Sequence, residues 1–199
     1  MLPGEPTPLV TQRLVLRAID GSDEAAIHEY RSDPSVTQYL SHGPLTAEAN
    51  SERLAQLLAL GAASNGKWFN YGWAITLRES GKVIGDARTW NSTALAATGV
   101  LAAGRHPAGE AALAYVLNAD YHHQGYGREA AAALVKWLFT HCGISTAVAA
   151  VYEPNSPSIR LLQSLGFRQD PFLPADQETA GKGFPLLMFR LDSPQHSSD

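Results

Sequence analysis

The spacing of hydrophobic residues changes along the chain, and each spacing predicts a different kind of element. In residues 13–17, arginine and aliphatic residues alternate, which is typical of a strand with one buried face. From residue 125 to residue 141, apolar residues recur every three or four positions, as in a helix that buries one side. Residues 145–151 are small or β-branched without a break, which fits a strand buried on both faces.

Capping and turn residues give the expected boundaries. Ser22 and Thr46 are predicted N-caps, and Pro34 ends the first helix. Pro157 lies at the first position of a later helix, and Gly166 fits its left-handed end. The expected strands are 13–17, 71–77, 82–89, 111–117, 145–151, a short one near 167–168 and 185–191; the expected helices start at 22, 46, 125 and 156.

This order, β-α-α-β-β-β-α-β-α-β-β, predicts an α/β or α+β fold with helices packed around a mixed sheet. Residues 91–109, rich in alanine and glycine, are expected to form a long connection. We expect one domain over residues 10–192, with flexible termini at 1–9 and 193–199.

Composition narrows the class of protein. The 15 basic and 19 acidic residues leave a formal charge of −4, which argues against a general nucleic-acid or anionic-membrane binder. Cys142 is the only cysteine, so an intrachain disulfide is excluded and a reducing compartment is expected. No apolar run approaches the roughly 20 residues that span a bilayer, and the start lacks the pattern of a signal peptide. We therefore expect a cytoplasmic enzyme.

The segment from His122 to Arg128 joins a predicted strand to the long helix. Gly125 and Gly127 allow a tight turn and let a ligand approach the backbone closely. The first N–H groups of a helix have no partner within it, and the helix dipole favours an anion beside them. Each hydrogen bond to a charged oxygen contributes about 1.5–3 kcal/mol. The turn is thus predicted to bind a phosphate or pyrophosphate group.

Two other nucleotide motifs are excluded. Gly125, Gly127 and Ala130 spell the dinucleotide fingerprint G-x-G-x-x-A, and Glu153 lies near the distance of a ribose-binding acid. However, residues 118–124 separate the strand from the first glycine, and the chain after Glu153 is too short for the remaining βαβ units. A Walker loop is excluded because no Lys-Ser or Lys-Thr follows the glycines.

Three segments in this order resemble the GNAT N-acetyltransferases, specifically their RimJ/RimL-like branch. They are Thr11 to Arg17, Tyr115 to Leu117 running into Gln124 to Ala130, and Asn155 to Phe167 with its N-x-x-S and L-G-F elements. The resemblance covers roughly residues 10–191. It implies a mixed, mostly antiparallel central sheet with helices on both faces. It also implies acetyl-CoA as cosubstrate and direct transfer of the acetyl group to a primary amine in a ternary complex.

The resemblance further implies roles for single residues. The strands 111–117 and 145–151 would splay apart and hold pantetheine between them, with backbone amides polarising the thioester carbonyl. Ser158 would return a proton to the leaving thiolate, and Asn155 would hydrogen-bond near the pantetheine arm. The implied cofactor-binding residues are Val116, Leu117, Gln124, Gly125, Tyr126, Gly127, Arg128, Asn155 and Ser158.

Ser158 has a second interpretation from the residues themselves. It precedes Leu161, Leu162 and Leu165 at helical spacing, which places it on the buried face. A serine early in a helix also commonly bonds to nearby backbone.

The chain departs from the family pattern at two positions. His122 stands where the loop usually begins with Gln or Arg, and it adds charge only when protonated. Ala112 stands where the branch often carries a glutamate that acts as base. Glu110, two residues earlier on the same strand face, is the replacement candidate; the alternative is an exposed residue at a strand start. The adjacent histidines His122 and His123 have poor metal-ligand spacing, so no metal is expected.

The missing glutamate bears on the acceptor. At pH 7 an α-amine with a pKa of ~7.7–8 is about a tenth to a sixth deprotonated, against about one part in 2,500 for lysine. The hypothesis is therefore an acceptor that is a peptide or protein N-terminus or another amine of low pKa. The alternatives are a small-molecule amine, including an antibiotic, and a non-catalytic acetyl-CoA-binding regulatory module. The protein is expected to be a monomer or homodimer.

Overall fold

The computed structural model describes residues 6–65, 68–94, 101–103, 108–171 and 183–194. Its helices are α1 (Glu24–Arg31), α2 (Pro34–Thr37), α3 (Ala47–Ala63), α4 (Tyr126–His141) and α5 (Ser156–Ser164), with 3-10 turns η1 (Gly21–Asp23) and η2 (Ala119–Tyr121). Its strands are β1 (Leu9–Val10), β2 (Leu14–Ala18), β3 (Asn70–Leu77), β4 (Val83–Trp90), β5 (Ser92–Ala94), β6 (Leu101–Ala103), β7 (Glu110–Leu117), β8 (Thr146–Tyr152), β9 (Arg168–Asp170) and β10 (Leu186–Asp192).

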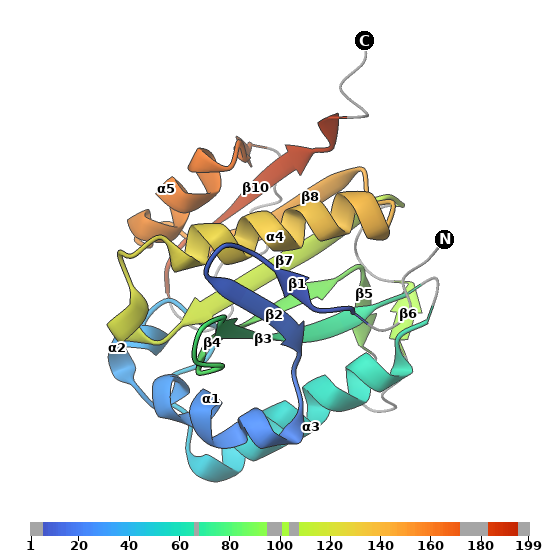
Figure 1. Ribbon diagram of the computed structural model, residues 1–199. Helices are drawn as coiled ribbons and strands as arrows, with labels where there is room; N and C mark the ends of the chain where they lie inside the picture. The colour runs from blue at the N-terminus through green and yellow to red at the C-terminus, as the bar shows by residue number, and fades with distance from the viewer. Residues whose placement is uncertain (1–5, 66–67, 95–100, 104–107, 172–182, 195–199) are drawn as a thin grey trace.

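Eight strands form one sheet in the order β1-β2-β3-β4-β7-β8-β10-β9. Every neighbouring pair is antiparallel except β7 and β8, which run parallel. Figure 1 shows α4 along one side of this sheet and α1 and α3 on the other side. The expected mixed, mostly antiparallel sheet with helices on both faces is confirmed.

The larger hydrophobic core lies between the sheet and α4. Trp137 of α4 is 2% exposed and packs edge-on against Trp73 of β3, with ring centroids 4.9 Å apart. A second, smaller core between the sheet and α1 and α3 contains Ile27, Tyr30 and Leu54. Two separate cores therefore hold helices against both faces of the sheet.

The parallel pair β7 and β8 is joined over a short stretch only. The register pairs Glu110 with Thr146, Ala111 with Ala147 and Ala112 with Val148, and no pairing follows. The last five residues of β7 therefore leave β8, and their backbone groups on that edge are free to bind a ligand.

Most predicted boundaries agree with the structure. The Thr46 side chain caps α3 by accepting a hydrogen bond from Ala49 N, and Gly166 follows α5 with a φ of +93°. Ser22 is not a cap, because it lies inside η1 and donates to the Asp20 side chain. Pro34 follows α1, as predicted. It is also the first residue of the short helix α2, which the Asp33 side chain caps.

Three further expectations need correction. The predicted connection over 91–109 contains a hairpin of β5 and β6, and its residues 95–100 and 104–107 lie outside the described part. Leu9 belongs to β1 and pairs with Leu16, so the ordered chain begins before residue 10. Ser193 is buried, and its N–H donates to Ser145 O at 2.7 Å, so the ordered chain extends past residue 192. No helix among the described residues is long and apolar enough to cross a membrane.

Candidate active site

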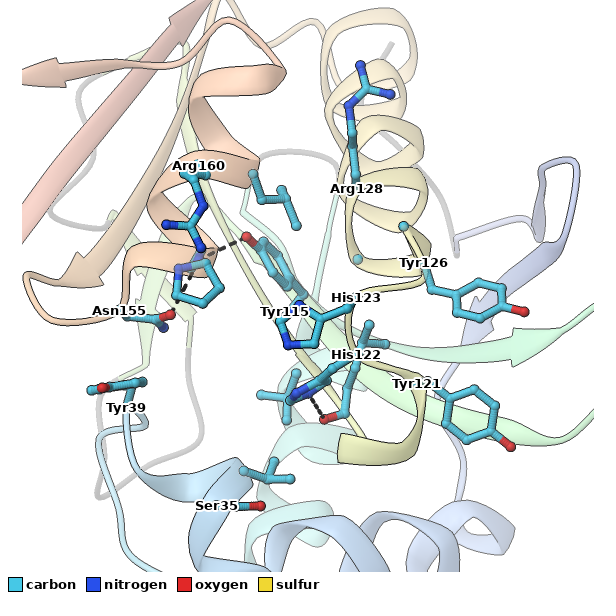
Figure 2. A pocket seen from close by; sticks show the side chains of 18 of the residues that line it. Ser35, Tyr39, Tyr115, Tyr121, His122, His123, Tyr126, Arg128, Asn155 and Arg160 are labelled. Atoms are coloured by element: carbon cyan, nitrogen blue, oxygen red, sulfur yellow. Dashed lines mark hydrogen bonds between the residues drawn. The ribbon is translucent and has the colours of Figure 1, made fainter.

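A cavity of about 500 Å³ lies where β7 leaves β8, within the size range of small-molecule sites. Its walls come from α2, the end of β7, the turn before α4 and the start of α5 (Figure 2). Its lining residues include eight of the nine predicted cofactor-binding residues: Val116, Leu117, Gly125, Tyr126, Gly127, Arg128, Asn155 and Ser158. Gln124 does not line it; its side-chain Nε2 donates to Asp120 O instead.

The turn before α4 has the geometry of an anion-binding helix start. Gly125 is the N-cap with a φ of +82°, and no side chain caps the helix. His123 also has a positive φ, +58°. The first N–H groups of α4 are thus left for a ligand in the cavity, where the helix dipole favours negative charge. Arg128 and Arg160 line the same cavity. The Nε of Arg128 donates to Ser164 Oγ at 3.1 Å at the end of α5, so its guanidinium points away from the turn (Figure 2).

Arg13 of the first segment holds this turn in place. Its Nη1 donates to Gln124 O at 2.9 Å, and its guanidinium lies 4.3 Å from the centre of the Tyr126 ring. Its Nε and its backbone N–H each donate to a different oxygen of Glu129, both at 2.8 Å. Thr11 also donates to Glu129. Thr11 and Arg13 therefore hold the segment 124–130 in place, and we call this set of contacts the clamp.

At neutral pH the ionised Glu129 carboxylate stabilises the clamp. Burial raises the pKa of Glu129, but hydrogen bonds from Thr11 and Arg13 and the Arg13 charge outweigh it, so the pKa lies below its ordinary value. Such a carboxylate stabilises the folded protein above its unfolded-state pKa of about 4.3. That contribution is lost as the pH falls through the lower folded-state pKa.

We expect Arg13→Met to weaken acetyl-CoA binding about tenfold, equivalent to ~1.4 kcal/mol, because the turn must then be ordered on binding. Titration calorimetry with acetyl-CoA measures this, and Arg168→Met on the distant strand β9 is the matched control. Arg168→Met should keep the wild-type affinity, and unchanged affinity in Arg13→Met would contradict the clamp.

Ser158 and Tyr115 form a hydroxyl pair within the cavity. The Ser158 Oγ lies 3.0 Å from the Tyr115 OH, and both residues are partly buried (Figure 2). Burial raises the pKa of Tyr115 to about 12, although its hydrogen bond with Ser158 acts in the opposite direction. The phenol is therefore protonated near pH 7 and is able to replenish a proton on Ser158.

Tyr115 was not assigned a role from the sequence. Its partner lies 43 residues away, so the pairing appears only in the folded chain. The strand pattern did contain a clue, because Tyr115 is on the face of β7 that carries Leu113 and Leu117 toward α4 and α5.

Two polar side chains have local structural roles beside the cavity. The Asn155 Oδ1 accepts a hydrogen bond from Ser158 N at 3.3 Å and caps α5, which fixes where Ser158 projects. The His122 Nε2 lies 3.0 Å from Leu117 O. A carbonyl oxygen only accepts, so this nitrogen carries the proton. His122 thereby ties the turn to the end of β7.

Glu110 does not reach this site. It begins β7, six residues before Val116, which corresponds to roughly 20 Å of extended chain. Its carboxylate forms an ion pair with Arg190 of β10, at the end where β7 and β8 are still paired. The proposed base role for Glu110 is therefore withdrawn, because the strand carries it away from the gap.

Gly127 lies where α4 packs closely against its neighbours. A Cβ on Gly127 would lie 3.1 Å from a Leu161 methyl and 3.5 Å from a Leu117 methyl, so this glycine allows α4 to approach α5 and β7.

Cys142 is buried beyond the other end of α4, and burial raises the pKa of its thiol to about 12. A neutral, enclosed thiol of this kind is a packing residue.

Comparison with known proteins agrees with this geometry. Residues 13–168 match the family described as "Acetyltransferase (GNAT) domain". The chain is 28% identical over 186 residues to the uncharacterized N-acetyltransferase p20 of Bacillus licheniformis, covering 92% of this chain and 94% of that protein.

Solved structures share the fold at lower sequence identity. The ribosomal L7/L12 alpha-N-protein acetyltransferase RimL in complex with coenzyme A superposes with a TM-score of 0.73 at 16% identity, covering 94% and 98% of the two chains. The spermidine N-acetyltransferase of Vibrio cholerae, in complex with CoA and spermine, gives 0.70 at 14% identity, covering 92% and 96%. With a family match over most of its length and a splayed sheet beside an open helix start, the chain belongs to the GNAT acetyltransferases and is an N-acetyltransferase.

Proposed function

We propose that this enzyme transfers the acetyl group of acetyl-CoA directly to the α-amine of a peptide or protein, as in the RimJ/RimL-like branch. The observation that carries the proposal is the position of the Ser158–Tyr115 pair. It lies in the same cavity as the free helix start of α4 and the unpaired end of β7. An anion-binding element, a slot for an extended arm and a proton donor thus share one site.

The residues present fit the parts of acetyl-CoA. The N–H groups at the start of α4, including that of Arg128, suit the pyrophosphate, and Arg160 lines the same cavity. The free edge of β7 near Val116 suits the amides of pantetheine and offers an N–H to the thioester oxygen. Gln124, predicted as a cofactor residue, would take part through its backbone only, since its side chain is engaged elsewhere.

Transfer then needs one proton donor and no covalent enzyme intermediate. The amine nitrogen forms a bond to the carbonyl carbon, and the carbon–sulfur bond breaks with its electron pair remaining on sulfur. Ser158 gives its hydroxyl proton to the thiolate and receives the phenolic proton of Tyr115. The amine loses its extra proton to water, and a proton from water restores Tyr115.

The lining of the cavity favours an amine of low pKa. Within the described part of the chain, its lining residues include no aspartate or glutamate. A lysine amine would need such a base, since it is almost fully protonated at pH 7, whereas an α-amine is deprotonated in about a tenth to a sixth of molecules. The distance of Glu110 from the cavity strengthens this preference.

We expect a peptide with a free α-amine to be acetylated at least tenfold faster at pH 7 than an N-terminally blocked peptide whose only amine is lysine. The rate with the α-amine should rise with pH to about 8 and then level off, because the amine itself is the group that titrates. Mass spectrometry of the two peptides across pH 6–10 measures both effects. A clear preference for the lysine peptide or for spermidine would overturn the assigned acceptor and leave the acetyltransferase intact.

A further inference from the structure

The face of the sheet opposite the Ser158 pair is open beside the gap. Ala114 of β7 and Ala150 of β8 are both exposed, although these strands lie in the middle of the sheet. Leu113 and Ala149 point into the core beneath α4, so Ala114 and Ala150 point the other way. They flank the gap just past the last paired residues. An acceptor lying over Ala114 and Ala150 would reach the gap from the side opposite Ser158.

Beside Ala114 lies an arginine, Arg88, that has no acidic partner among the described residues. Arg88 of β4 pairs directly with Ala114 in the sheet and projects from the same face. Its Nε donates to Asn70 Oδ1 at 2.6 Å, and its guanidinium lies 5.0 Å from the centre of the Trp90 ring. Among the described residues, none contributes a carboxylate to this guanidinium.

Asn70 itself is incompletely satisfied. Its side chain is fully buried at the start of β3, and because Nε of Arg88 only donates, the amide oxygen must face Arg88. Its Nδ2 is then a buried donor, and it has no hydrogen-bond partner within the described structure. Buried donors of this kind are rare and mark a place where a partner belongs.

The surrounding charges leave positive charge in excess. Asp86 lies two residues before Arg88 on the same face of β4, and Arg31 and Tyr30 already occupy both of its oxygens at 2.6–2.9 Å. Arg53 of α3 is exposed; its charge acts on Arg88, and it lines a small pocket with Arg31 and Asp86. Burial, and secondarily the neighbouring Arg53, lower the pKa of Arg88 to about 10, so Arg88 is charged at pH 7. The Arg88 guanidinium and the Asn70 amide donor therefore lie together, and no carboxylate among the described residues is bound to either.

We propose that Arg88 and Asn70, with the charge of Arg53 nearby, bind an anionic group of the acceptor, a carboxylate or phosphate, lying within about three residues of the reactive amine. The estimate of three residues follows from strand spacing: a group held near β3 and β4 is on the order of 10 Å from the gap, and extended chain covers about 3.3 Å per residue. This inference rests on the proposed acetylation of peptide α-amines. It narrows the acceptor to N-termini followed closely by acidic or phosphorylated residues.

The test compares peptides that share one N-terminal residue and differ at positions two and three. The set carries Asp-Asp, Asn-Asn, Lys-Lys or a phosphoserine pair, and kcat/KM is measured for each with wild-type enzyme. We expect Asp-Asp or phosphoserine to exceed Asn-Asn by at least about tenfold, the effect of one hydrogen-bonded charge pair. The better of these two peptides identifies the anion as carboxylate or phosphate.

Variants then locate the effect. Arg88→Met should reduce the preference to near unity while acetyl-CoA affinity stays unchanged, and Arg168→Met, on a distant strand, should retain it. Arg53→Glu should shift the preference toward Lys-Lys, a gain that misfolding cannot produce. Equal rates on all peptides, or a preference that survives both Arg88→Met and Arg53→Glu, would overturn the anion site alone. Failure to acetylate any peptide would overturn the proposed function as well.

Discussion

Gly127→Val is expected to weaken acetyl-CoA binding by at least a hundredfold. The new side chain would press on Leu161 and Leu117, whose methyls lie 3.1 and 3.5 Å from the position that its Cβ would take and which both line the cavity. Overpacking of this kind costs about 1–3 kcal/mol and displaces neighbouring backbone. Here the displaced backbone is the first turn of α4, whose N–H groups are the anion-binding element.

The reason for this effect differs from the one that the motif suggests. The loop pattern implies that a side chain at this glycine would block the phosphate directly, whereas the Cβ faces the wall formed by α5 and β7. Gly127→Ala, with a single methyl, should therefore retain most of the affinity. Calorimetry on both variants, with thermal unfolding to verify that each is folded, measures the difference. A folded Gly127→Val protein with wild-type affinity would refute the assignment of this turn.

Ser158→Ala and Tyr115→Phe are each expected to lower kcat about a hundredfold or more, while acetyl-CoA affinity remains within a few-fold of wild type. Loss of a positioned proton donor typically costs this much, and neither hydroxyl is needed to bind phosphate. Because the two groups pass one proton in sequence, the double variant should be little slower than either single variant.

Thr140→Val, at the far end of α4, is the control for loss of a hydroxyl. Steady-state kinetics and calorimetry together separate turnover from binding. If Ser158→Ala lost its affinity for acetyl-CoA but kept its turnover with bound substrate, Ser158 would be a helix-start structural residue instead of an acid.

The fold could be predicted well because its signals are local. Alternation in residues 13–17, the Thr46 cap and the Gly166 stop each depend on a few neighbouring residues, and each agrees with the structure. The helix α2 was missed because Pro34 was interpreted only as a stop, although the same residue also favours the first turn of a new helix.

The site was predictable where it follows a contiguous motif. The turn at Gly125 to Arg128 and the start of α5 lie together in the cavity, as the resemblance implied. The contacts between distant segments were not predictable, since the Arg13–Glu129 pair spans 116 residues and the Tyr115–Ser158 pair spans 43. Glu110 failed for a geometric reason: sharing a strand face with position 112 says nothing about which end of the strand meets the substrate.

The most direct test of the proposed acetyl transfer is release of free thiol from acetyl-CoA in the presence of amines. The wild-type enzyme is mixed with acetyl-CoA and a panel of α-amine peptides, lysine peptides and polyamines, and free CoA is measured over time. We expect thiol release that depends on an α-amine acceptor and is nearly absent in Tyr115→Phe. Tight binding of acetyl-CoA without acceptor-dependent thiol release would contradict acetyl transfer and would identify a CoA-binding regulatory protein.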